Sequence, residues 1–213
     1  MTSDLDLRER RELCDLFDEL GPSAPTLCGG WTTADLAAHL LVRERDPRSA
    51  PGILLGGRME AYTEQLMARQ LDRLGYRGVV DKVRNGPPWG PLSIPVIRHA
   101  MNIVEFFVHH EDVRRANGAK LRTDRPDLDA ELWAMTRRML PLMVRRSKVD
   151  NVRLEIVSTE GGRAAAGKGA EVTMTGAVQD LLLQLYGRDS VVDVELTGDP
   201  AAVARVEAAP FGL

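Results

Sequence analysis

The residues best suited to chemistry in this sequence are a glutamate within the apolar segment 103–108 and a histidine just beyond it. Glu105 stands among isoleucine, valine and phenylalanine residues, where a carboxylate is costly to bury unless it is paired or binds a cation. If the segment is helical, His109 lies one turn along on the same side, about 40° around the helix. Two such side chains can supply two ligands to a divalent metal ion, and Asp112 falls on the same stripe, where it would orient the imidazole. The apolar setting also predicts a raised pKa for Glu105, because burial disfavours the charged carboxylate.

A third ligand must come from elsewhere in the chain, and His39 is the strongest candidate. It lies between Leu36 and Leu40 in an apolar helical pattern, so its ring is expected to point partly inward. Two histidines and one carboxylate leave coordination positions open, as catalytic metal sites do. By ligand type zinc is the first choice, and iron, nickel or manganese would also fit. The alternative is a simple charged pair of Glu105 and His109 without a metal.

The remaining histidines and the two cysteines are not expected to be metal ligands. His99 and His110 point to other sides of the helix that carries Glu105, and we expect them at the surface or at an interface. Cys14 occupies an apolar helical position typical of a small core residue. Cys28 lies in a glycine-flanked loop and could carry a reactive thiol, although an inert thiol is the preferred interpretation.

Local patterns place these residues on helices. Thr32 and Asp35 form a capping-box pattern that begins a helix through about residue 45, and Trp31 before it is expected to staple that helix to the core. The longest helical pattern begins at residue 94 or 95 and ends at residue 116, before the C-cap pair Asn117-Gly118. Further helices are expected over residues 4–20, 59–74, 79–84 and 127–148, with a loop over 85–91 and a kink near Pro141.

After residue 150 the pattern becomes that of a small α+β region. Residues 152–158 alternate apolar and polar side chains, which predicts a half-buried strand. A turn at 160–162, strands over 171–175 and 191–196, and helices over 176–186 and 199–207 are also expected. Helices followed by a strand-rich region predict an α+β chain with two domains, residues 1–148 and 149–213.

Composition limits the classes of function. The 213 residues are 44% hydrophobic and 28% charged with a net charge of −3, which allows a sizeable core and argues against the basic face of a nucleic-acid binder. The longest apolar runs are far shorter than the ~18 residues that span a bilayer, and no signal-peptide pattern opens the sequence. We therefore expect a cytoplasmic monomer or homodimer that acts on a small molecule, without nucleic-acid or membrane partners.

Three segments carry a resemblance to a known family. Residues 30–40, GWTTADLAAHL, resemble the GWT-x-x-DL-x-x-HL segment of the DinB-like metalloenzyme superfamily. Residues 105–112 resemble the E-x3-H-x2-D segment of its mycothiol-dependent maleylpyruvate isomerase branch, and residues 178–188 with 198–200 are similar to the small sterol-carrier-like α+β domain of that branch. Within the branch the chain most resembles metal-binding proteins of undefined activity.

The resemblance implies a four-helix bundle that holds a divalent metal on His39, Glu105 and His109, followed by the sterol-carrier-like domain. It also implies an isomerase or transferase that uses a low-molecular-weight thiol of the mycothiol type on a small electrophilic substrate. In this hypothesis the metal ionises the thiol, Asp112 supports the metal ligand His109, and Arg188 binds a substrate carboxylate across the cleft between the domains. An exposed arginine at a helix end is the alternative role for Arg188. A non-catalytic metal- or ligand-binding module and a metal-dependent hydrolase are the other functions left open.

Overall fold

The computed structural model describes residues 4–45, 58–87 and 94–212. The chain divides into two compact units, residues 1–120 (the helical unit) and residues 121–213 (the sheet unit). The described residues form both helices and a four-stranded sheet, which confirms the expected α+β class. None of the helices in these ranges is both long enough and apolar enough to cross a membrane.

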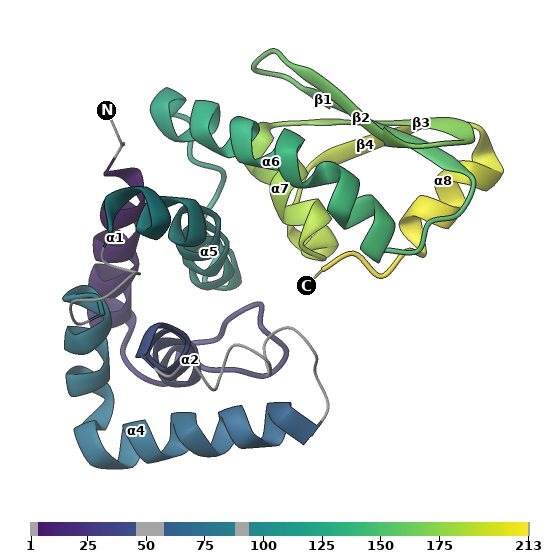
Figure 1. The fold of residues 1–213 in the computed structure, drawn as a ribbon. Coiled ribbons are helices and arrows are strands. Elements are labelled where there is room, and N and C mark those ends of the chain that lie inside the picture. The colour runs from purple at the N-terminus through teal and green to yellow at the C-terminus, as the bar shows by residue number, and fades with distance from the viewer. Residues whose placement is uncertain (1–3, 46–57, 88–93, 213) are drawn as a thin grey trace. The chain divides into compact units, whose positions relative to one another are not determined.

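Four helices of the described residues make up the helical unit (Figure 1). They are α1 (Leu5–Leu20), α2 (Thr33–Arg45), α4 (Arg58–Arg84) and α5 (Pro95–Ala116). Helix α2 packs along α4, and α1 packs against both α4 and α5. Their apolar sides bury a core that includes Phe17, Leu36, Leu40, Val80 and Phe106. Apolar residues recur at helical spacing in each of these segments, which is why periodicity predicts the helices.

Helix α2 begins as the sequence predicts. The backbone N–H of Thr32 donates to the Asp35 carboxylate at 2.9 Å, and the Thr32 hydroxyl donates to the same carboxylate at 2.6 Å. The N–H of Asp35 in turn donates to the Thr32 hydroxyl oxygen at 3.4 Å, which completes the capping box. Trp31 packs against the helical core. These contacts fix the start of α2 and with it the position of His39 about two turns later.

Helix α4 bends at Gly75. The φ of 64° and ψ of 168° at this residue leave helical geometry and lie in a region that favours glycine. Figure 1 shows the chain changing direction within α4. The two segments correspond to the helices expected over 59–74 and 79–84, and the loop expected over 85–91 is described only as far as residue 87.

The sheet unit contains strands in the order β2-β1-β3-β4. Their bounds are β1 (Val152–Ser158), β2 (Arg163–Gly167), β3 (Ala170–Gly176) and β4 (Val194–Gly198). Strand β1 pairs antiparallel with β2 and parallel with β3, whereas β3 pairs antiparallel with β4. The sequence pattern does not predict β2, because its run of small residues lacks the alternation of a strand. The strand expected from residue 191 begins at Val194, after a short 3-10 turn, η2 (Asp189–Val191).

Three helices cover the sheet (Figure 1). They are α6 (Pro126–Arg146), α7 (Val178–Leu185) and α8 (Pro200–Glu207). Helix α6 packs on β2 and α7, and Leu140, Met143 and Val144 from α6 belong to the core of the sheet. The division at residues 120 and 121 therefore lies earlier than the domain boundary expected at 148 and 149. The amphipathic pattern of α6 shows that one side is buried, but it does not show which partner buries it.

Replacing Gly162 should destabilise the sheet unit. This glycine has a φ of 145°, and a Cβ built there would lie 2.6 Å from the Trp133 ring. We expect Gly162→Ala to lower the free energy of unfolding by about 1–3 kcal/mol, measured by denaturant unfolding followed through tryptophan fluorescence. Gly161→Ala is the matched control, because its Cβ would meet no atom within 4 Å. Equal losses in the two variants would contradict the importance of the Trp133 contact.

Candidate metal centre

The structure brings His39, Glu105 and His109 together within the helical unit. His39 comes from α2 and the other two from α5, and one ligand atom of each lies within 4.8 Å of the others. Glu105 Oε1 is 3.6 Å from His39 Nε2 and 3.4 Å from His109 Nε2. Ligands bound at about 2.0–2.2 Å in a tetrahedral arrangement are roughly 3.3–3.6 Å apart. The donor set and its spacing therefore fit a divalent metal ion.

His39 is buried and suited to act as a neutral ligand. Its ring lies 5.1 Å from the Trp31 ring and 5.3 Å from the His109 ring, measured between centroids. Its Nδ1 is buried and has no hydrogen-bond partner in the part of the chain that the structure describes. Burial lowers the pKa of His39, and this effect exceeds the opposing contribution of Glu105. The uncharged imidazole is the form that binds metals.

His109 contacts Asp112, the residue that the sequence places one turn further along the same stripe. His109 Nδ1 lies 2.9 Å from the carboxylate of Asp112, whose side chain is fully buried. Because a carboxylate accepts, Nδ1 carries a proton and Nε2 faces Glu105. Burial lowers the pKa of His109, but hydrogen bonds with Asp112, Cys28 and Glu105 raise it by more, so the pKa lies well above its ordinary value.

Arg43 is a residue of the site that the sequence pattern does not assign. Its Nε lies 3.0 Å from Glu105 Oε1, and its other nitrogens donate to groups of α5. Burial raises the pKa of Glu105, but hydrogen bonds with His109 and His39 and the charges of His109 and Arg43 lower it by more. The pKa is therefore well below its ordinary value, and the expected rise is wrong. The available signal was that Arg43 follows His39 by one helical turn.

Cys28 also reaches the site. Its Sγ lies 3.0 Å from the Asp112 carboxylate and 3.7 Å from His109 Nδ1. The loop is held there by the backbone N–H of Leu27, which donates to the Asp112 carbonyl at 3.1 Å. Asp112 is therefore shared between an imidazole and a thiol. Cys14, in contrast, is a core residue as predicted, and burial raises the pKa of its thiol to about 12.

The prediction that His99 and His110 lie at the surface or at an interface is wrong. Both are buried against α1, with His99 Nδ1 3.2 Å from Asp6 and His110 Nδ1 3.0 Å from Glu9. Glu9, Glu12 and His110 also form a second group of side chains with ligand atoms within 4.8 Å of one another. The pattern of α5 shows the directions of these histidines, but only the packing of α1 shows what they meet.

Arg188 belongs to the sheet unit, where it follows α7. It is partly buried, and its guanidinium donates to the carbonyl of Tyr186 at 2.6 Å. The candidate metal centre is made entirely of residues of the helical unit. A role for Arg188 in binding a substrate carboxylate stays a prediction.

Comparison with known proteins gives structural matches without a sequence match. No protein-family model matches the chain, and no curated protein matches it in sequence. The chain is similar to the crystal structure of the mycothiol-dependent maleylpyruvate isomerase, with a TM-score of 0.52 and 17% identity over 91% of this chain and 89% of that chain. A histidine-to-alanine mutant of that enzyme gives a TM-score of 0.51 and 16% identity over 90% and 89% of the two chains. These similarities show the fold.

Zinc should stabilise the protein only when the candidate centre is intact. A ligand that binds the folded state adds RT ln(1 + [L]/Kd), about 2.7 kcal/mol at a hundredfold excess over Kd. We expect excess Zn²⁺ to raise the melting temperature by several degrees and a chelator to reverse the rise. The shift should be absent in Glu105→Gln and His109→Asn, because each variant loses a ligand. Differential scanning calorimetry measures these shifts.

His110→Asn is the matched control for the melting experiment. It removes a buried imidazole from the same helix, but one that pairs with Glu9. This variant should keep the Zn²⁺-dependent shift. If only His110→Asn lost the shift, the metal would instead be bound by Glu9, Glu12 and His110. If Zn²⁺ left the wild-type melting temperature unchanged, a metal site would be contradicted.

Metal binding should release a proton at neutral pH. The raised pKa keeps His109 charged in the metal-free protein, and a metal ion binds only the neutral imidazole. The apparent affinity for Zn²⁺ should therefore fall as the pH drops and level off above the raised pKa of His109. Isothermal titration calorimetry in buffers of different ionisation enthalpy counts the released protons. An affinity that does not change between about pH 6 and pH 8 would contradict the assignment.

Proposed function

We propose that the chain is a divalent-metal enzyme that uses a low-molecular-weight thiol of the mycothiol type to isomerise a small electrophilic substrate or transfer a group to it. The observation that carries the proposal is the approach of His39 Nε2 and His109 Nε2 to one oxygen of Glu105 at 3.6 and 3.4 Å. Three protein ligands leave positions open for a thiol or a substrate. The shared fold with the mycothiol-dependent maleylpyruvate isomerase supports the choice of thiol chemistry.

The residues of the chain prepare this centre for a cation. A divalent metal, with zinc the first choice for two histidines and a carboxylate, ionises a coordinated thiol and polarises a substrate carbonyl. Asp112 keeps the proton of His109 on Nδ1, so that Nε2 is the ligand atom. Hydrogen bonds with His109 and His39, together with the charge of Arg43, favour the charged form of Glu105, and burial favours the neutral form of His39.

The proposal extends to the architecture and to the second unit. We assign the helical unit as a DinB-like four-helix bundle. We assign the sterol-carrier-like domain to the sheet unit. The motif of residues 30–40 supports the first assignment, since it spans the start of α2 and includes His39. The motif of residues 178–188 supports the second, since it begins with α7. In this scheme Arg188 binds a carboxylate group of the substrate.

One observation favours a non-catalytic metal-binding module as the second candidate. The Glu105 oxygen that would ligate the metal also accepts from Arg43 Nε at 3.0 Å. A guanidinium at this distance competes with a cation for the same oxygen. A centre that binds its metal weakly could serve to sense the metal instead of activating a thiol.

A turnover assay separates these functions. We expect zinc-loaded protein to convert maleylpyruvate, used as the probe electrophile, only when mycothiol is present. Substrate loss without thiol loss indicates an isomerase, and equal losses of the two indicate a transferase. Glu105→Gln should lower the rate by more than the ~10–100-fold typical of residues that merely support a ligand.

Two results would contradict the thiol-dependent enzyme. Ester hydrolysis by the zinc-loaded protein without any thiol would identify a hydrolase, in which bound water is the nucleophile. Zinc binding at His39, Glu105 and His109 without turnover of maleylpyruvate or esters would identify the binding module. His110→Asn again provides the control, since its rate should match that of the wild type.

A further inference from the structure

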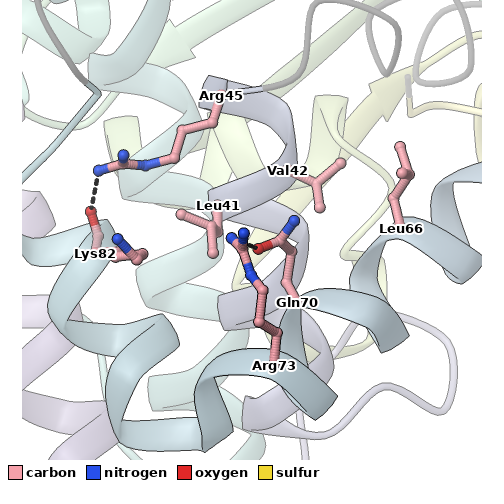
Figure 2. A pocket seen from close by; sticks show the side chains of 7 residues that line it. All are labelled: Leu41, Val42, Arg45, Leu66, Gln70, Arg73 and Lys82. Carbon is pink, nitrogen blue, oxygen red and sulfur yellow. Dashed lines mark hydrogen bonds between the residues drawn. The ribbon is translucent and has the colours of Figure 1, made fainter.

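Helices α2 and α4 enclose a cavity of about 230 Å³ within the helical unit (Figure 2). The bend at Gly75 lets both segments of α4 take part in its lining. Gln70 and Arg73 come from the segment before the bend, and Lys82 comes from the segment after it. The cavity therefore depends on the bent shape of α4.

The cavity and the candidate metal centre lie on different sides of α2. Leu41 and Arg45 line the cavity, and they lie about 200–240° around the helix from His39. His39 and Arg43 instead reach Glu105 on α5. The two sites can therefore be altered independently.

The cavity carries positive charge without a compensating carboxylate. Its cationic lining residues are Arg45, Arg73 and Lys82, and no acidic side chain lines it among the described residues. None of the three forms an ion pair with a carboxylate in the described ranges, whereas Arg10 in the same unit is paired with Glu44. Like charges around a small space repel one another, so an anion in the cavity would relieve this repulsion.

The polar side chains of the lining offer N–H donors, and the side-chain oxygen of Gln70 already accepts a hydrogen bond. Arg45 donates from Nη2 to the Lys82 carbonyl at 3.1 Å, while its Nε is buried and has no partner within the described chain. Gln70 Oε1 accepts from Arg73 Nη2 at 2.7 Å, which leaves the Gln70 amide nitrogen as a donor (Figure 2). Charged and neutral N–H groups without acceptors match an oxyanion.

The opposite part of the lining is apolar and small. Leu41 and Val42 are buried in the helical core, and Leu66 packs against it. A cavity of about 230 Å³ is below the ~300–1,000 Å³ of pockets for drug-sized ligands. We propose that this cavity binds a small organic anion, with a carboxylate or phosphate head against Arg45, Arg73 and Lys82 and a short apolar chain against the leucines.

Titration of hexanoate and hexyl phosphate into the full-length protein tests this site. We expect saturable binding by isothermal titration calorimetry, weakened by added salt. The double variant Arg73→Gln/Lys82→Gln should bind at least about tenfold more weakly, because it removes two charged donors. Neither side chain is buried, so the variant should melt like the wild type. Arg69→Gln, an exposed arginine of α4 outside the lining, is the matched control and should bind like the wild type.

Two further probes test the head and the chain of the ligand separately. Neutral hexanol and tail-less inorganic phosphate should each bind at least about tenfold more weakly than the better of the two hexyl anions. A preference for hexanoate or for hexyl phosphate identifies the head group. The proposal is overturned if neither hexanoate nor hexyl phosphate saturates the protein at about 10 mM. It is also overturned if hexanol or inorganic phosphate binds as tightly as the hexyl anions. Equal weakening of binding in Arg69→Gln and in the double variant would overturn it as well.

Discussion

The helical unit is organised around one carboxylate that its surroundings must neutralise. Glu105 lies between valine and phenylalanine in the middle of α5, where an uncompensated charge would be costly. His39 and Arg43 reach its oxygen from α2, at 3.6 and 3.0 Å, and His109 reaches it from the next turn of α5. Helices α2 and α5 must therefore hold a fixed position along each other. This holds whether the charge of Glu105 is balanced by protonated histidine and the Arg43 guanidinium or by a metal ion.

Buried polar pairs position α1 in a similar way. One pair joins α1 to α2 and two others join it to α5: Arg10–Glu44, Asp6–His99 and Glu9–His110. A buried polar pair adds little net stability, but removing one partner leaves the other buried and unsatisfied. We infer that these pairs select the register of α1, while the apolar core supplies most of the favourable free energy of folding. This arrangement also explains why histidines outside the candidate centre are buried.

Among the described residues of the helical unit, three groups of side chains could hold a metal ion, and one of them, Cys28 with His109 and Asp112, shares His109 with the candidate centre. The candidate centre and the group of Glu9, Glu12 and His110 differ in detail. In the candidate centre two imidazoles approach the same carboxylate oxygen, and a buried aspartate holds the remaining nitrogen of one of them. In the group on α1 and α5, His110 uses its Nδ1 to meet Glu9 directly. A fold shared at 17% identity supports many activities, so function must be argued from such differences within a site.

Local patterns in the sequence determined the helices, most of the strands and the positions of the side chains that form the candidate centre. The capping box sets the place of His39 on α2, and the spacing of Glu105 and His109 puts them on one side of α5, because both depend only on nearby residues. The tertiary structure alone decided that Arg43 joins His109 and His39 in lowering the pKa of Glu105, that Cys28 contacts Asp112 beside His109, and that α6 packs on the sheet. It also decided that two segments of α4 close a cavity against α2. These contacts join segments far apart in the chain, and the periodicity of a helix specifies its buried side but not the partner that covers it.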